Sequence, residues 1–186
     1  MTLGSEMKDA SHKMEQAVVH LKDDLAGIRT GRATPAVLSR VSVDYYGTEV
    51  PLNQLASMTV PEPRLLQVQP FDKNAIGSIE KAIMTSDLGI TPSNDGNIIR
   101  LAFPPLTEER RRELVKQVHH RAEETRVAVR NVRRHAKDSM EKLEREGGIS
   151  EDDLVRSEKE LQKLTDRFVG EVDEIQTHKE HELMEV

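Results

Sequence analysis

The chain has no cysteine and no tryptophan, and aromatic residues make up only 3% of its 186 residues. Without cysteine there is neither a disulfide framework nor a thiolate that could serve as nucleophile or metal ligand. An enzyme with a deep apolar pocket ordinarily uses more large apolar side chains than this composition supplies. Long helices with narrow apolar seams need fewer of them and carry charged surfaces, which suits a charged fraction of 32%.

Long apolar stretches are missing as well. No segment is long enough to cross a bilayer, and residues 1–6 lack the basic start and the apolar run of a secretory signal peptide. We therefore expect a soluble, cytoplasmic protein with no membrane partner.

The short motifs of common catalytic and metal sites are also absent. Neither phosphate-binding pattern, G-x-x-x-x-G-K or G-x-G-x-x-G, occurs in the sequence. Asn94-Asp95-Gly96 lacks the closing glutamate of a calcium loop and predicts a turn. His178 and His181 are about one helical turn apart, but no third ligand is in register with them. We expect no catalytic residues, no metal, no cofactor and no small-molecule substrate.

Positive charge is scarce overall but concentrated in one block. The net charge is −6, yet residues 107–137 contain 10 Lys and Arg against 5 Asp and Glu. Residues 138–186 show the opposite balance, with 7 against 16. Because charges act over roughly 8 Å at physiological salt, the basic block is more informative than the total.

Three stretches have apolar residues at helical spacing. The first spans residues 7–28. The second begins after Pro104-Pro105, with Thr107 as N-cap, and ends at Gly147-Gly148. The third begins at Ser150, which forms a capping-box pattern with Asp153. The apolar seam of the second stretch consists of Leu114, Val118, Ala122, Thr125, Val129, Val132, Ala136, Met140 and Leu143.

The first helical stretch supplies the third face that the other two need to bury their seams. Between these helices, short strand candidates occur at residues 41–47, 49–52, 58–60, 65–68 and 98–101, with one helix opened by Asp72. The sequence therefore predicts an α+β fold. A long three-helix bundle from residues 1–30 and 106–186 carries an inserted small α+β domain, residues 31–105.

Two linkers connect the predicted domains. One contains glycine and the other contains two prolines, a combination that favours a hinge. The predicted hinge residues are Thr30, Gly31, Arg32, Phe103, Pro104 and Pro105.

Seven basic residues of the second helix share one face, roughly 110° from its apolar seam, so we expect them to face solvent. Arginine accounts for 8 of the 10 basic residues in 107–137, and its planar fork matches phosphate oxygens bidentately. With no aromatic residue nearby, folded RNA is favoured over single strands. Charge patterning alone leaves open a second interpretation, a solvated face that complements the acidic third helix. The row consists of Arg112, Lys116, Arg126, Arg130, Arg133, Arg134 and Lys137.

Several motifs resemble those of bacterial ribosome recycling factors. In order, they are residues 28–33 (IRTGRA), 44–47 (DYYG) with 54–57 (QLAS), 80–89 (EKAIMTSDLG), 104–111 (PPLTEERR), 127–134 (VAVRNVRR) and 161–166 (LQKLTD). The resemblance spans nearly the whole chain.

This resemblance implies an L-shaped molecule of tRNA-like dimensions, in which a three-helix bundle and a β/α/β domain meet at a hinge. It implies that a non-enzymatic monomer binds large-subunit ribosomal RNA in the post-termination ribosome. With elongation factor G and GTP, the ribosome is then split into subunits. The RNA-binding residues carried over by motif are Arg29, Arg32, Arg110, Arg130, Arg133 and Arg134.

Two other functional classes remain as alternatives. A coiled-coil adaptor or chaperone-like module would expose its apolar seams and oligomerise through them. An enzyme in the inserted domain would need a concave polar cluster, which the sequence does not indicate. Within that domain, Tyr45 and Tyr46 alternate along a strand, so we expect one in the core and one exposed.

Overall fold

The structure, a computed structural model, describes residues 2–185 and contains two compact units. The helical unit comprises Met1–Asp23 and Val115–His181, and the sheet unit comprises Asp24–Leu114 and Glu182–Val186. The chain thus leaves the helical unit, builds the sheet unit, and returns to complete the helices.

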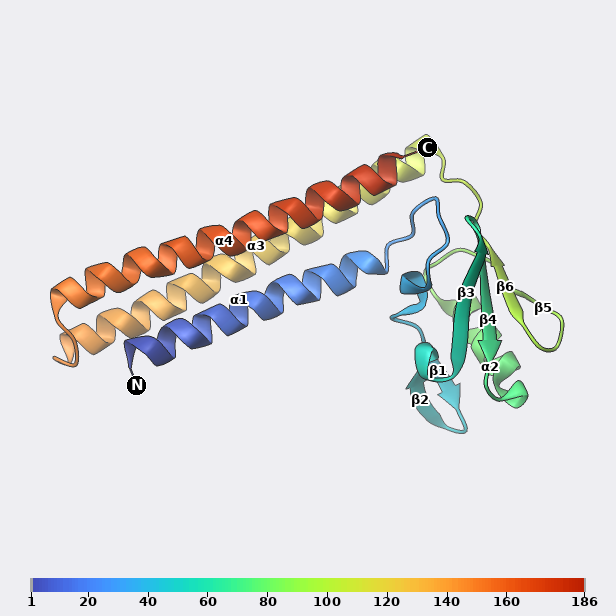
Figure 1. Ribbon diagram of the computed structural model, residues 1–186, viewed down its shortest axis with the longest axis horizontal. Helices are drawn as coiled ribbons and strands as arrows, with labels where there is room; N and C mark the ends of the chain where they lie inside the picture. Colours follow the sequence, from blue (N-terminus) through green and yellow to red (C-terminus); the bar gives the residue numbers. More distant parts are fainter. Residues whose placement is uncertain (1, 186) are drawn as a thin grey trace. The chain divides into compact units, whose positions relative to one another are not determined.

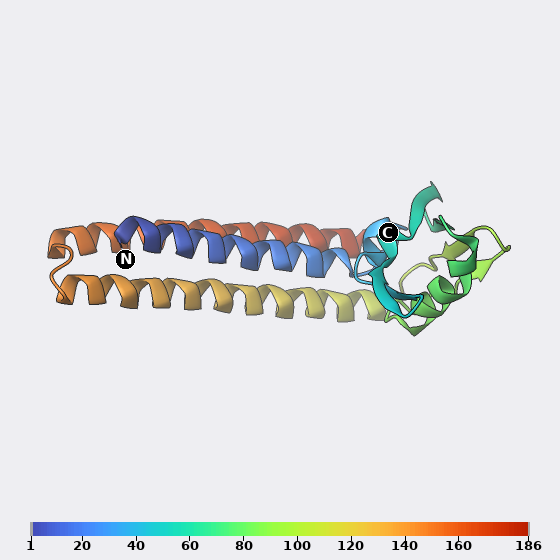
Figure 2. The ribbon, with the colours of Figure 1, turned by 90° about the horizontal axis from the view of Figure 1, so that it is seen from below.

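The helical unit is built from the long helices α1 (Leu3–Ala26), α3 (Glu108–Arg145) and α4 (Glu151–Met184), which lie side by side in both ribbon views (Figures 1 and 2). At 1.5 Å per residue, the 38 residues of α3 extend about 57 Å. The three helices confirm the predicted bundle and, with the sheet unit, the α+β class.

The predicted helix ends are confirmed by their hydrogen bonds. Thr107 Oγ1 accepts from the backbone N–H of Arg110 at 3.1 Å, and Ser150 Oγ accepts from that of Asp153 at 3.1 Å. After α3, Gly147 has a φ of +75°, a left-handed conformation that favours glycine. The Gly148 N–H then donates to the carbonyl of Leu143 at 2.9 Å, which closes the helix end.

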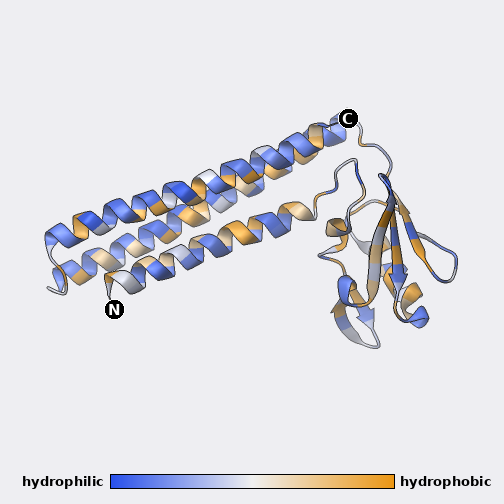
Figure 3. Cartoon of the chain, in the orientation of Figure 1, coloured by the Kyte–Doolittle hydropathy of each residue, from blue (hydrophilic) through white to orange (hydrophobic). Residues whose placement is uncertain are grey.

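The apolar seam of α3 is buried nearly as predicted. Val132 and Leu143 are only half-buried, whereas the other seven predicted residues are buried. Facing them are buried residues of α1, such as Met14 and Leu21, and of α4, such as Phe168. Figure 3 shows apolar and hydrophilic residues alternating along these helices. Because the seams are covered within one chain, they do not offer the exposed apolar surface that an adaptor requires.

The sheet unit contains two antiparallel sheets. β1 (Ser42–Tyr45) and β2 (Thr48–Pro51) form a hairpin. The larger sheet has the order β3-β4-β6-β5, with β3 (Ala56–Glu62), β4 (Leu65–Pro70), β5 (Ser93–Asn94) and β6 (Ile99–Ala102). The helix α2 is Ile76–Thr85, and three 3₁₀ turns lie at Pro35–Leu38, Leu52–Gln54 and Lys73–Ala75.

The core of the sheet unit lies between α2 and the strands. Ile79 and Ile83 of α2 are buried together with alternate residues of β4 and β6, among them Val68 and Leu101. Phe103, directly after β6, belongs to the same core at 2% exposure. The apolar residues of α2 at helical spacing and the alternate apolar residues of the strands therefore face one common core.

The sequence predicts a turn at Asn94-Asp95-Gly96 but does not indicate the short strand β5 that overlaps it. Ser93 and Asn94 pair with Arg100 and Ile99 of β6. Two polar, exposed residues cannot show the apolar alternation by which a strand is recognised. Only the turn that follows them has a local signal.

The two tyrosines of the β1–β2 hairpin separate as predicted. Tyr45 packs against the core, whereas Tyr46 is 76% exposed, with a φ of +50°. Both phenols donate to the same oxygen of Asp72, at 3.1 and 3.3 Å. Asp72 also accepts from the backbone N–H of Asn74, which lowers the pKa of its carboxyl group more than either tyrosine does. The hairpin is thereby tied to the turn that opens α2.

Candidate nucleic-acid interface

The basic row of α3 is not uniformly solvent-facing. Its members differ in whether α4 supplies a carboxylate, an amide or nothing as their partner. This difference separates residues that hold the bundle together from residues that remain able to bind a ligand.

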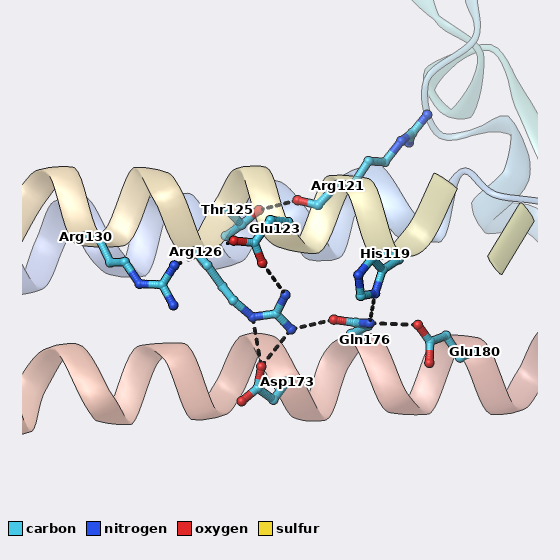
Figure 4. A network of polar contacts seen from close by, with 9 residues as sticks. All are labelled: His119, Arg121, Glu123, Thr125, Arg126, Arg130, Asp173, Gln176 and Glu180. Carbon is cyan, nitrogen blue, oxygen red and sulfur yellow. Dashed lines mark hydrogen bonds and ion pairs between the residues drawn. The ribbon is translucent and has the colours of Figure 1, made fainter. Parts of the chain in front are cut away.

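Arg126 corrects the prediction that the whole row faces solvent, since its side chain is only 12% exposed. Its Nε and Nη2 donate to one oxygen of Asp173 on α4, at 2.9 and 2.7 Å. Nη1 donates to Glu123 at 3.1 Å, and Nη2 also reaches the amide oxygen of Gln176. Figure 4 shows the guanidinium turned toward α4. Arg126 is a link between helices.

Gln176 extends this network along α4 (Figure 4). Its amide nitrogen donates to Glu180 at 2.7 Å and lies 2.8 Å from Nδ1 of His119. This contact joins the His119 ring of α3 to the amide of Gln176 on α4. Gln176 is buried at 8% exposure, and its polar side-chain atoms find hydrogen-bond partners in this network.

Lys137, at the other end of the row, is also paired across the bundle. Its ammonium lies 3.5 Å from Glu158 of α4 and 3.6 Å from Glu141, one turn along α3. The positive charge of Lys137 is therefore largely balanced within the chain.

Three arginines between these two linked positions remain available. Arg130 is half exposed and lies 3.6 Å from Glu123, a carboxylate that Arg126 already binds. Arg134 is exposed and has no ion pair within residues 2–185. Arg133 donates from Nη1 to the amide oxygen of Gln162 at 3.1 Å, so it is held without meeting a carboxylate.

Arg110 and Arg112, near the start of α3, are paired only within that helix. Arg110 donates to Glu113 at 2.8 Å, and Arg112 bonds Glu108 one turn earlier. Their side chains are at least half exposed. Exposed pairs at this spacing contribute only about 0.3–0.5 kcal/mol, so a phosphate could replace the carboxylate easily.

Arg29 is more enclosed than a surface contact residue usually is. Its Nη2 donates to the carbonyl of Pro104, and the guanidinium carbon lies 5.9 Å from the ring centroid of Phe103. Nε is buried and has no hydrogen-bond partner within the described residues. Burial, followed by the charge of Arg110, lowers the pKa of Arg29. Two guanidiniums thus repel each other here, a local excess of positive charge that an anion would relieve.

The remaining predicted hinge residues differ in how firmly they are held. Thr30 and Arg32 form a small turn in which the Thr30 hydroxyl accepts from the Arg32 N–H at 3.4 Å. Gly31 lies in open space, because a Cβ there would meet no atom within 4 Å. Phe103, by contrast, is anchored in the core, and its N–H donates to the Arg64 carbonyl at 2.7 Å.

Two kinds of feature are absent from residues 2–185. No group of three His, Cys, Asp or Glu side chains is placed to hold a metal ion. None of the helices that these residues form is long and apolar enough to span a membrane.

The predicted site residues do not include Gln162, Asp173 and Gln176, the residues of α4 that contact the basic row. The acidic composition of the third helix does not by itself show which of its residues lie opposite each basic residue of the second. A usable signal existed, because residues 158, 162, 166, 173 and 176 recur at helical steps along one side of the third helix.

Comparisons with known proteins give a consistent result. A family model described as ribosome recycling factor matches residues 21–184. A ribosome-recycling factor of Acidothermus cellulolyticus is 54% identical over 178 residues, which are 96% of each chain. That of Natranaerobius thermophilus is 55% identical over 181 residues, covering 97% of this chain and 98% of the relative.

Solved structures resemble the chain as a whole. A solution structure of the ribosome recycling factor matches with a TM-score of 0.81 and 46% identity, covering 100% of this chain and 99% of that one. A second match is a model of the T. thermophilus ribosome recycling factor, bound with E. coli elongation factor G to the E. coli post-termination complex. Its TM-score is 0.70 and its identity 49%, with both chains fully covered.

Proposed function

Because this chain belongs to the ribosome recycling factor family, we propose that it binds the post-termination ribosome through large-subunit ribosomal RNA. With elongation factor G and GTP, it then promotes separation of the subunits. The relative that is described on the post-termination complex together with elongation factor G supports both partners.

The observation that carries the RNA contact is the group formed by Arg130, Arg133 and Arg134. These guanidiniums lie on one helix between two positions, 126 and 137, whose charges α4 already balances. The planar guanidinium of arginine can bind phosphate oxygens with two hydrogen bonds. A helix face that contacts only solvent would not require this geometry. Arg32 and Arg110, both exposed, and the half-buried Arg29 complete the proposed RNA-binding set.

The helical unit suits the role of a rigid anchor. Its core includes fully buried side chains such as Val118, Val129 and Met140, and interhelical hydrogen bonds add to it. A packed bundle of this kind transmits force with little deformation. We propose that elongation factor G acts on the sheet unit, and that the predicted hinge residues permit the resulting movement.

The chemistry of GTP hydrolysis belongs to the partner in this proposal. The sequence contains neither of the phosphate-binding glycine patterns, so the chain supplies shape and charge instead of catalytic groups. It acts as a cytoplasmic monomer and is not an enzyme.

The decisive experiment follows light scattering of post-termination ribosomes after mixing with the chain, elongation factor G and GTP. We expect scattering to fall as subunits separate, only when all three components are present. A chain that leaves the scattering unchanged under these conditions refutes the proposed function. Omitting GTP tests whether the nucleotide is required.

A further inference from the structure

Residues 161–166 form a motif that contributes no residue to the proposed RNA-binding set. Leu161 and Thr165 face the core at 2% and 3% exposure, and the Thr165 hydroxyl donates to the Leu161 carbonyl at 2.8 Å. Gln162 and Asp166, one turn apart, are exposed. Their hydrogen bonds connect them to each other and to α3.

A short chain of hydrogen bonds runs from α3 into this motif. Nη1 of Arg133 donates to Oε1 of Gln162 at 3.1 Å, and Nε2 of Gln162 donates to Oδ1 of Asp166 at 2.8 Å. A carboxylate can only accept, so Asp166 keeps the amide nitrogen on its own side. The amide oxygen must then face Arg133.

The residues of α4 that pair with Arg126 and Lys137 are acidic, unlike Gln162. Asp173 meets Arg126 at 2.7 Å, and Glu158 lies 3.5 Å from Lys137. Gln162, located between these two acids on α4, is neutral. Arg133 therefore donates a hydrogen bond that fixes its position, and among the described residues no carboxylate of α4 forms an ion pair with it.

We propose that Gln162 is a positioning residue for Arg133, and that Asp166 sets the orientation of Gln162. The pair holds the guanidinium in place with one N–H while its other donors stay available to an RNA phosphate. This inference rests on the proposed function. It explains how the side chain of Arg133 is held in one position while its positive charge stays available to a phosphate. Ordering before binding reduces the entropy lost on binding.

Gln162→Glu tests the inference most directly, because it changes an amide into a carboxylate of the same size. The new carboxylate would pair with Arg133 and compete with phosphate. We expect about tenfold weaker ribosome binding, which corresponds to about 1.4 kcal/mol. The slope of log affinity against log salt should decrease by about one, because one phosphate contact is lost.

Gln16→Glu is the matched control, since it makes the same chemical change at an exposed position of α1. It adds the same negative charge without placing it at Arg133. We expect an affinity within about twofold of wild type, because the hydrogen-bond acceptor of Arg133 is on α4 and is unchanged in this variant. Circular dichroism melts of both variants report whether the bundle stays folded.

A double-mutant cycle distinguishes positioning from a general charge effect. If Gln162 acts through Arg133, Gln162→Glu should weaken binding in the wild-type background and have almost no further effect in Arg133→Ala. Equal effects in the two backgrounds would overturn the inference.

Gln162→Met removes the hydrogen-bond acceptor but adds no charge. We expect a loss of affinity of a few-fold with an unchanged salt slope, because the phosphate contact is weakened without being neutralised. Binding of this variant equal to wild type would also overturn the inference.

The outcomes separate this inference from the function on which it depends. If the wild-type chain does not bind ribosomes, the proposed function fails. If wild type binds and Arg133→Ala weakens binding, but Gln162→Glu behaves like Gln16→Glu, only the positioning role fails.

Discussion

The guanidinium of Arg126 and the carboxylate of Asp173 join α3 to α4 through two hydrogen bonds to one oxygen, at 2.9 and 2.7 Å. The two residues are 47 positions apart in sequence. Arg126 thus stabilises the bundle, in contrast to the members of the basic row that we propose contact RNA.

Arg126→Ala should destabilise the helical unit without removing an RNA contact. The substitution leaves the buried Gln176 with one acceptor unsatisfied and breaks the link to α4. We expect a loss of about 1–3 kcal/mol in the free energy of unfolding, measured by urea denaturation. Ribosome affinity below the unfolding transition should stay near that of wild type. A stable variant that no longer binds would contradict this assignment.

Arg133→Ala should show the opposite pattern. Loss of a charged hydrogen bond to phosphate costs about 1–3 kcal/mol, so co-sedimentation with ribosomes at moderate salt should weaken accordingly. The thermal midpoint should change little, because the partner Gln162 is exposed and can bind water. Lys142→Ala, an exposed position on the same helix, is the control. Unchanged binding of Arg133→Ala would argue against the RNA contact.

Gly31→Pro tests the predicted hinge. Proline fixes φ near −65° and restricts the preceding residue, so it should slow subunit splitting while ribosome binding stays nearly intact. Gly31→Ala is the matched control, because a Cβ at this position meets no atom within 4 Å. Splitting at the wild-type rate by the proline variant would show that the hinge assignment is wrong.

Acid should weaken the β5–β6 turn through Asp95. Hydrogen bonds from the backbone N–H groups of Ile98 and Asn97, followed by Arg100, lower the pKa of Asp95 to about 2. A carboxyl whose folded pKa lies below its unfolded value of about 3.9 stabilises the fold above that value. The contribution is lost as the pH falls toward about 2.

The comparison with Asp95→Asn isolates this contribution. The variant should be less stable than wild type at neutral pH, and the difference should shrink as the pH falls from about 4 to about 2. Denaturant unfolding monitored at several pH values measures it. A difference that is constant across this range would contradict the assignment.

Local signals account for what could be predicted. Thr107, Ser150 and Gly147 mark helix ends through bonds within a few residues, and the seam of α3 follows from helical spacing alone. The partners of Arg126 could not be obtained in this way. They depend on which turn of α4 lies opposite Arg126. The sequences of α3 and α4 do not specify how far one helix is shifted along the axis of the other.

The same limit explains the difference between Arg133 and its neighbours. All members of the basic row look alike in sequence, and they become distinct only when Asp173, Gln162 and Glu158 are placed opposite them. The family resemblance selected Arg130, Arg133 and Arg134 and did not select Arg126. Packing provides a physical reason for that selection.

The carboxylate of Asp72 accepts hydrogen bonds from both Tyr45 and Tyr46, so the hairpin is attached to the turn before α2 by two separate phenols. If either phenol is replaced by phenylalanine, the other still fastens the turn to the beginning of α2. A survey that alters one tyrosine at a time will therefore underestimate this attachment, and only the paired replacement, or a change at the aspartate, will reveal its full strength.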